Sequence, residues 1–157
     1  MLPFSLGARV ATEDVDVFIK AIDKAQFGSL YASLRNAGFW CLNGESDSEL
    51  YSYLAEGLAL RFACEGTVFP NFEVKFAKKF LDLEAFSDVL NVIMPLGALK
   101  VSSLERQIAF KRYWLKSEKD LADAEHLEKV FKDKLDSGKM DAYRRLIGNE
   151  MAETRQE

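Results

Sequence analysis

Two aspartates separated by a single residue, Asp14 and Asp16, are the residues whose type and spacing point most directly to chemistry. They lie in the stretch 12–18, where Val15 and Val17 favour a β-strand because they are β-branched. Side chains alternate between the faces of a strand, so both carboxylates point the same way, about 7 Å apart. Such a pair can bind one divalent cation or two neighbouring ones, and oxygen ligands suit Mg²⁺ or Mn²⁺. The alternative is that both lie on the solvated face of an edge strand.

A third carboxylate, Glu73, lies in the segment 72–76, where apolar and charged residues alternate. The two phenylalanines and the valine face one way, whereas Glu73 and Lys75 face the other. The segment 58–64 alternates in the same manner, and a glycine and a Pro-Asn pair separate the two segments. We therefore expect neighbouring strands joined by a hairpin-like loop. The alternative to a ligand role for Glu73 is an exposed position that pairs with Lys75.

The composition is that of an ordinary globular protein, with 157 residues, 48% apolar and 29% charged. This length indicates one domain that buries a substantial core. The formal net charge of −4 excludes a surface that attracts polyanions as a whole, so a polyanion would need a local basic patch. The sequence shows no signal peptide and no apolar run of the roughly 18–20 residues that cross a bilayer, so we expect a cytoplasmic protein without membrane contact.

The cysteines and the single histidine argue against several kinds of catalytic site. Cys41 and Cys64 are isolated and form no zinc-binding pattern, so we expect reduced thiols with structural roles. His126 lies off the apolar stripe of its expected helix, which predicts a surface position. A Ser-His-Asp or Cys-His mechanism would need this histidine, and we expect neither.

Helices and strands that would position the carboxylates follow from periodicity and capping residues. Asp23 is expected to cap a helix that reaches about Asn36, and Gly38 to end it. Ser117 is expected to begin another helix, which ends at Gly138. Further helices are expected over residues 48–55, 82–90, 104–115 and 141–151, and further strands over residues 39–42, 91–94 and 98–101.

Four segments, taken in order, resemble a known family. They are the Arg9-x-x-Thr12-x-Asp-Val-Asp strand, the strand that carries Glu73, residues 100–111 and residues 119–127. This order is similar to the small nucleotidyltransferase-fold proteins of the polymerase-beta-like superfamily. Within that superfamily the chain most resembles the AbiEii-type branch, which contains toxin-like and uncharacterised members.

The resemblance implies an α/β fold, with a mixed β-sheet flanked by helices and a helical C-terminal part. It implies a single domain over residues 1–157, with a sheet-containing core over 1–101 and a helical part over 102–157. Asp14 and Asp16 match the family's metal-binding pair. Glu73 matches the third carboxylate, where the family more often has aspartate.

The mechanism that the resemblance implies is metal-dependent transfer of a nucleoside monophosphate from an NTP to a hydroxyl on RNA, protein or a small molecule. Mg²⁺ or Mn²⁺ would bridge the triphosphate and lower the pKa of the attacking hydroxyl, and Glu73 or a neighbour would help to take its proton. Lys111 falls where the family has a lysine that neutralises triphosphate charge, although a solvated helix lysine is the alternative. Further candidates for substrate binding are Arg9, Thr12 and Lys75.

Two other aspartates match a Lys-Asp-x-x-Asp motif of the family, namely Asp120 and Asp123. For these we favour capping and hydrogen bonds between helices over catalysis.

The chain departs from the family pattern in three places. The Gly-Gly or Gly-Ser turn that grips the phosphates is absent before Asp14, so we expect either an N-terminal truncation or a lost turn. Glu73 stands for the usual aspartate, and Ser117, with Lys116 before it, stands where an arginine is expected. These departures favour slow or absent transfer. The rival hypotheses are therefore a degenerate protein that binds a nucleotide or protein partner, and a structural α/β domain with exposed acidic residues.

A sheet that lacks the strand preceding the aspartate pair would expose an unpaired edge, which is a template for pairing with another chain. We therefore expect a homodimer or larger assembly.

Overall fold

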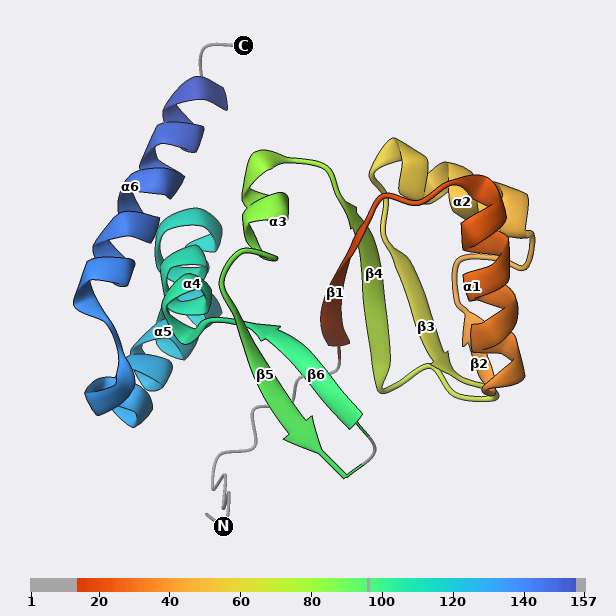
Figure 1. Cartoon of the computed structure of the whole chain (residues 1–157), viewed down its shortest axis with the longest axis horizontal. Coiled ribbons are helices and arrows are strands. Elements are labelled where there is room, and N and C mark those ends of the chain that lie inside the picture. The colour runs from red at the N-terminus through yellow and green to blue at the C-terminus, as the bar shows by residue number, and fades with distance from the viewer. Residues whose placement is uncertain (1–13, 96, 155–157) are drawn as a thin grey trace. The chain divides into compact units, whose positions relative to one another are not determined.

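The computed structural model describes residues 14–95 and 97–154, and of Asp14 it describes only the backbone. Arg9 and Thr12 lie outside the described residues. The chain divides into two compact units, and the first ends at Lys78 (Figure 1). The second unit contains a β-hairpin as well as helices. The expectation of one domain over residues 1–157, with its internal boundary at 101/102, stays a prediction.

The first unit combines a mixed four-stranded sheet with two helices, which confirms the predicted α/β class. The strand order is β1-β4-β3-β2, with β1 parallel to β4 and the other pairs antiparallel. The hairpin-like pairing expected between residues 58–64 and 72–76 is confirmed. The elements are β1 (Asp14–Lys20), α1 (Lys24–Asn36), β2 (Phe39–Cys41), α2 (Asp47–Glu56), β3 (Leu60–Cys64) and β4 (Asn71–Ala77).

The ends of helix α1 follow the predicted capping signals. The Asp23 side chain accepts a hydrogen bond from the Gln26 backbone N–H at 2.8 Å, and the Gln26 side chain accepts one from the Asp23 N–H. At the other end, Gly38 adopts a φ of 82°, which glycine reaches without steric cost. Both ends of α1 are therefore set by residues close in the sequence.

The core of the first unit lies between the helices and one face of the sheet. Phe27 of α1, Leu54 of α2 and Phe62 of β3 are at most 2% exposed. Val74 and Phe76 of β4 belong to the same cluster. Because side chains alternate along a strand, the residues between these positions lie on the opposite face of the sheet. That opposite face carries the charged residues of β3 and β4.

The second unit is mainly helical. Its buried cluster joins Leu81, Ala109 and Ile147, with aromatic side chains packed around them. The two strands of its hairpin confirm the strands predicted over residues 91–94 and 98–101. The elements are α3 (Phe80–Glu84), β5 (Val89–Met94), β6 (Gly97–Ser102), α4 (Leu104–Ala109), a π-helical segment (Phe110–Leu115), α5 (Glu118–Phe131), a 3₁₀ turn (Lys132–Lys134) and α6 (Ser137–Thr154).

Several predicted element ends are wrong, and capping explains two of them. The strand expected from residue 58 begins at Leu60, because the Leu58 N–H caps helix α2 by donating to Tyr53 O at 2.8 Å. Gly138 does not end a helix but lies in the first turn of α6. The Asp136 carboxylate starts that turn by accepting hydrogen bonds from the Gly138 and Lys139 N–H groups. Side-chain capping thus overrides the usual preference of glycine for helix ends.

Two further helices also differ from expectation. The helix expected over residues 82–90 is the shorter α3, because Asp88 O already accepts the Ser103 N–H at 3.1 Å and extends the hairpin. The helix expected over residues 104–115 changes to π-helical geometry at Phe110. It ends where Lys116 adopts a φ of 62° and donates to Lys111 O.

Asp88 anchors the hairpin to helix α6 and makes the second unit sensitive to acid. Its carboxylate accepts hydrogen bonds from Lys139 Nζ at 2.8 Å and from the Tyr143 hydroxyl at 3.1 Å. The Lys139 hydrogen bond, with smaller contributions from Ser103 and Tyr143, lowers the pKa of Asp88 below its ordinary value. A lowered pKa in the folded state stabilises the fold above the unfolded pKa of about 3.9, and this contribution is lost as the pH falls through the folded value.

We therefore expect the free energy of unfolding, measured with urea, to fall more steeply in the wild type than in Asp88→Asn as the pH drops below about 4. The control is Asp133→Asn, which removes an exposed carboxylate from the same unit. Its free energy of unfolding should fall with pH as steeply as that of the wild type. The prediction would be contradicted if the free energy of unfolding depended on pH equally in the wild type and in Asp88→Asn.

No helix among residues 14–95 and 97–154 combines the length and the apolar character needed to cross a membrane.

Candidate functional site

The candidate site lies on the face of the first unit's sheet that points away from α1 and α2. Strands β1 and β4 run parallel, and their register places Asp16 directly beside Glu73. On the other side of β4, Arg61 of β3 is the register partner of Glu73. Asp16, Glu73 and Arg61 therefore form one row across three strands. The structure thus brings together one member of the predicted aspartate pair and the predicted third carboxylate.

Glu73 is held by two cations. Its Oε1 lies 2.5 Å from Lys75 Nζ, and its Oε2 lies 3.0 Å from Arg61 Nε. The hydrogen bond from Lys75, together with that from Arg61, outweighs the opposing effect of burial and lowers the pKa of Glu73. The pairing with Lys75 is confirmed, but the exposed position expected with it is wrong, because the Glu73 side chain is only 13% exposed. Glu73 is thus an ionised carboxylate with both oxygens engaged.

Asn71 adds an unsatisfied acceptor to the same face, two residues before Glu73. Its register partner on β1 is Asp14, so it lies in the row next to that of Asp16 and Glu73. The residue is 5% exposed, and its Nδ2 donates to Val68 O at 3.2 Å. Its Oδ1 has no hydrogen-bond partner among the described residues. A buried amide oxygen without a donor costs free energy, and a bound ligand or water is the usual remedy.

Lys111 belongs to the second unit and is engaged there. Its Nζ lies 2.8 Å from Asp123 Oδ2 and 3.4 Å from Asp120 Oδ1. Burial acts to lower the pKa of Lys111, but the hydrogen bonds and charges of these two aspartates outweigh it and raise the pKa. The Ser117 hydroxyl caps α5 by accepting the Asp120 N–H at 3.1 Å. The hydrogen bonds between helices favoured for the two aspartates are confirmed, whereas the N-terminus of α5 is capped by the Ser117 side chain.

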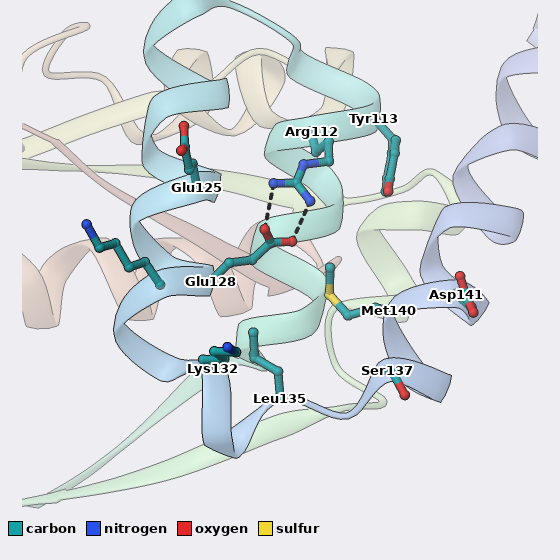
Figure 2. Close-up of a pocket in the computed structure, with 10 residues that line it drawn as sticks. Arg112, Tyr113, Glu125, Glu128, Lys132, Leu135, Ser137, Met140 and Asp141 are labelled. Atoms are coloured by element: carbon teal, nitrogen blue, oxygen red, sulfur yellow. Dashed lines mark hydrogen bonds and ion pairs between the residues drawn. The ribbon is translucent and has the colours of Figure 1, made fainter.

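A shallow hollow of about 670 Å³ lies in the second unit between the π-helical segment, α5 and α6 (Figure 2). A bidentate ion pair between Arg112 and Glu128 crosses it. Tyr113, Met140 and Asp141 contribute to its wall. Of the predicted site residues whose side chains the structure describes, none lines this hollow. The carboxylates that the sequence singles out lie instead on the sheet of the first unit, so we place the candidate site there.

The register of the strands brings carboxylate positions together for a divalent cation, but the described side chains do not yet form a metal-binding group. Asp14 and Asp16 occupy alternate positions of β1, and Glu73 neighbours Asp16. Among the side chains that the structure describes, no group of three His, Cys, Asp or Glu residues is placed to hold a metal ion. Glu73 can join Asp14 and Asp16 only by sharing or releasing its two cations. Oxygen donors from adjacent strands remain the ligand type that Mg²⁺ and Mn²⁺ prefer.

Sequence reasoning missed two residues of this face, Arg61 and Asn71. Arg61 is the charged residue between Leu60 and Phe62, and that alternation was the available signal that it lies opposite the core. Asn71 follows a proline, a pattern typical of a turn, although it is the first residue of β4.

No model of a known protein family matches the chain, and a comparison with curated proteins finds no match.

Proposed function

We propose that the first unit carries a divalent-metal site for nucleotidyl transfer. The reaction would move a nucleoside monophosphate from an NTP to a hydroxyl on RNA, a protein or a small molecule. The observation that supports this proposal is the register of two parallel strands, which sets Asp16 beside Glu73 on a face free of helices α1 and α2. Carboxylates on neighbouring strands are the ligand arrangement that metal-assisted phosphoryl chemistry uses.

Each residue of the face has a separate task in this proposal. Asp14, Asp16 and Glu73 would hold Mg²⁺ or Mn²⁺, which, when bound, stabilises negative charge on the triphosphate and acidifies the attacking hydroxyl. Lys75 extends from the same face with a side chain that is 42% exposed, so its ammonium can meet a phosphate oxygen.

Addition of Mn²⁺ or Mg²⁺ is expected to raise the melting temperature by several degrees. A ligand that binds only the folded state adds about 2.7 kcal/mol of stability at a concentration of 100 times its Kd. The double variant Asp14→Asn with Asp16→Asn is expected to lose this rise, because neutral amides are poor ligands for these cations. Differential scanning fluorimetry against metal concentration makes the measurement.

The matched control is Glu56→Gln with Glu65→Gln, which removes the same charge from two exposed positions of the same unit. It should keep the metal-dependent rise. If the Asp14 and Asp16 double variant kept the rise as well, the metal site would lie elsewhere.

The alternative function is binding of a nucleotide or protein partner without turnover. It is favoured by the two cations on Glu73, which occupy the oxygens that the reaction would need. The engagement of Lys111 by Asp120 and Asp123 favours it as well, since that ammonium is already neutralised. Stabilisation by metal or NTP without transfer of label would distinguish this function from the enzyme.

A further inference from the structure

Arg61 and Lys75 converge on one carboxylate from two directions. Arg61 reaches Glu73 from the neighbouring strand β3, and Lys75 reaches it along β4. We propose that these two cations bind the polyphosphate chain of the nucleotide, which displaces Glu73 and releases its carboxylate toward Asp16. This inference rests on the proposed function and adds to it a phosphate-binding pair and an order of events.

The exposure of the three side chains supports exchange of Glu73 for an external anion. The side chains of Arg61 and Lys75 are 54% and 42% exposed, whereas that of Glu73 is 13% exposed. The cations therefore reach into solvent above a carboxylate that lies lower on the sheet. An anion can approach both from outside without a change in the strands.

Arg61 also has unused hydrogen-bonding capacity. It contacts Glu73 through Nε, and its two terminal nitrogens make no hydrogen bond to another residue of the described chain. A guanidinium presents its donors as a planar fork that matches two phosphate oxygens, and Lys75 adds a point charge. The pair is therefore suited to a chain of phosphates more than to a single carboxylate.

Charge balance sets the direction of the exchange. Arg61 and Lys75 together carry two positive charges, and Glu73 supplies one negative charge, so these three side chains carry one net positive charge, which Asp16 in the same row balances. A triphosphate carries more charge than Glu73 and has several oxygens within reach of both cations. Once released, the Glu73 carboxylate lies beside Asp16 by register, where a divalent cation gains a further ligand.

Binding of inorganic tripolyphosphate in the presence of EDTA tests this inference without metal or nucleotide base. Isothermal titration calorimetry should show that Arg61→Gln and Lys75→Gln each weaken binding about tenfold or more, since each removes a charge-assisted contact. Glu73→Gln should tighten binding severalfold, because the competing carboxylate is gone. Arg35→Gln, which removes an exposed positive charge from helix α1, should leave the affinity unchanged.

Two comparisons separate competition from a general effect of charge. Asp16→Asn removes a negative charge from the neighbouring position and should tighten binding less than Glu73→Gln does. The tightening by Glu73→Gln should disappear in the Arg61→Gln background, as a coupled pair requires. Equal effects of Asp16→Asn and Glu73→Gln, or full additivity with Arg61→Gln, would overturn the displacement of Glu73.

The outcome is independent of the metal experiment. This inference would be overturned if the affinity for tripolyphosphate did not depend on Arg61 and Lys75, even if Mn²⁺ stabilises the protein through Asp14 and Asp16. Binding that needs both cations would support the inference, even if metal gave no stabilisation and the proposed transfer reaction failed. Circular dichroism of each variant checks that the fold is kept. We expect it to be kept in the Arg61 and Lys75 variants, because both side chains are largely exposed.

Discussion

Replacing Phe62 with alanine is expected to lower the free energy of unfolding by about 3–5 kcal/mol, the usual cost of emptying a buried aromatic site. Phe62 is 1% exposed and lies at the centre of the first unit's core. Its ring is 5.4 Å from that of Phe72 in a stacked arrangement and 6.3 Å from that of Tyr31. Removal of the ring leaves a cavity between the sheet and α1 that the backbone fills only in part. Urea denaturation followed by circular dichroism measures the loss.

Phe80→Ala is the matched control, because it removes the same group from a position that is 51% exposed. It should cost far less, since an exposed ring contributes little buried area. Phe62→Leu should fall between the two, because leucine fills part of the site. Similar losses for Phe62→Ala and Phe80→Ala would show that the core lies elsewhere than the structure places it.

Phe62 also connects the core to the candidate site. Its neighbour Arg61 points to the opposite face, so the position of the Phe62 ring on the helical side fixes which way Arg61 points. A shift of one residue in β3 would exchange the two faces and separate Arg61 from Glu73. The same strands thus position the hydrophobic core and the charged row.

The sequence predicted the faces of the strands and the pairing of β3 with β4, but not the partner of β1. Alternation in residues 72–76 placed Glu73 and Lys75 together, and the spacing of Asp14 and Asp16 placed them on one face. That β1 pairs with β4 in parallel, with Asp16 beside Glu73, depends on contacts between distant segments. Local periodicity contains no information on such pairing, because any two strands of suitable pattern can be neighbours.

Arg61 and Lys111 also depend on contacts between distant segments, which the sequence does not reveal. In the sequence Arg61 is a solitary charge in an apolar strand, and its role follows only from its register with Glu73. Lys111 was assigned to the site through the family resemblance, whereas the packing of two helices gives it Asp120 and Asp123 as partners. Helix capping, by contrast, was predictable at Asp23 because a capping box needs only residues close in sequence.

The largest functional effect is expected for Asp16→Asn in the transfer reaction. Loss of one preorganised charged or polar group in an active site commonly costs two to three orders of magnitude in rate. We expect that reduction in the rate at which label from an NTP is transferred to total RNA or protein in the presence of Mg²⁺ or Mn²⁺. Asp16 makes no ion pair to another described residue, so the variant should keep the wild-type stability and isolate the chemical effect.

The wild-type rate itself is expected to be low, so the assay needs enzyme in excess over acceptor. The reason is that Lys75 and Arg61 engage both oxygens of Glu73, so this carboxylate is not free to hold a metal ion or to take a proton. Label that appears with the wild type and with Glu65→Gln, but not with Asp16→Asn, would place transfer at the β1–β4 face. Equal labelling by Asp16→Asn would contradict a transfer site there. Metal-dependent stabilisation without any labelling would favour nucleotide or partner binding as the function, with the two cations on Glu73 as the physical reason for the missing turnover.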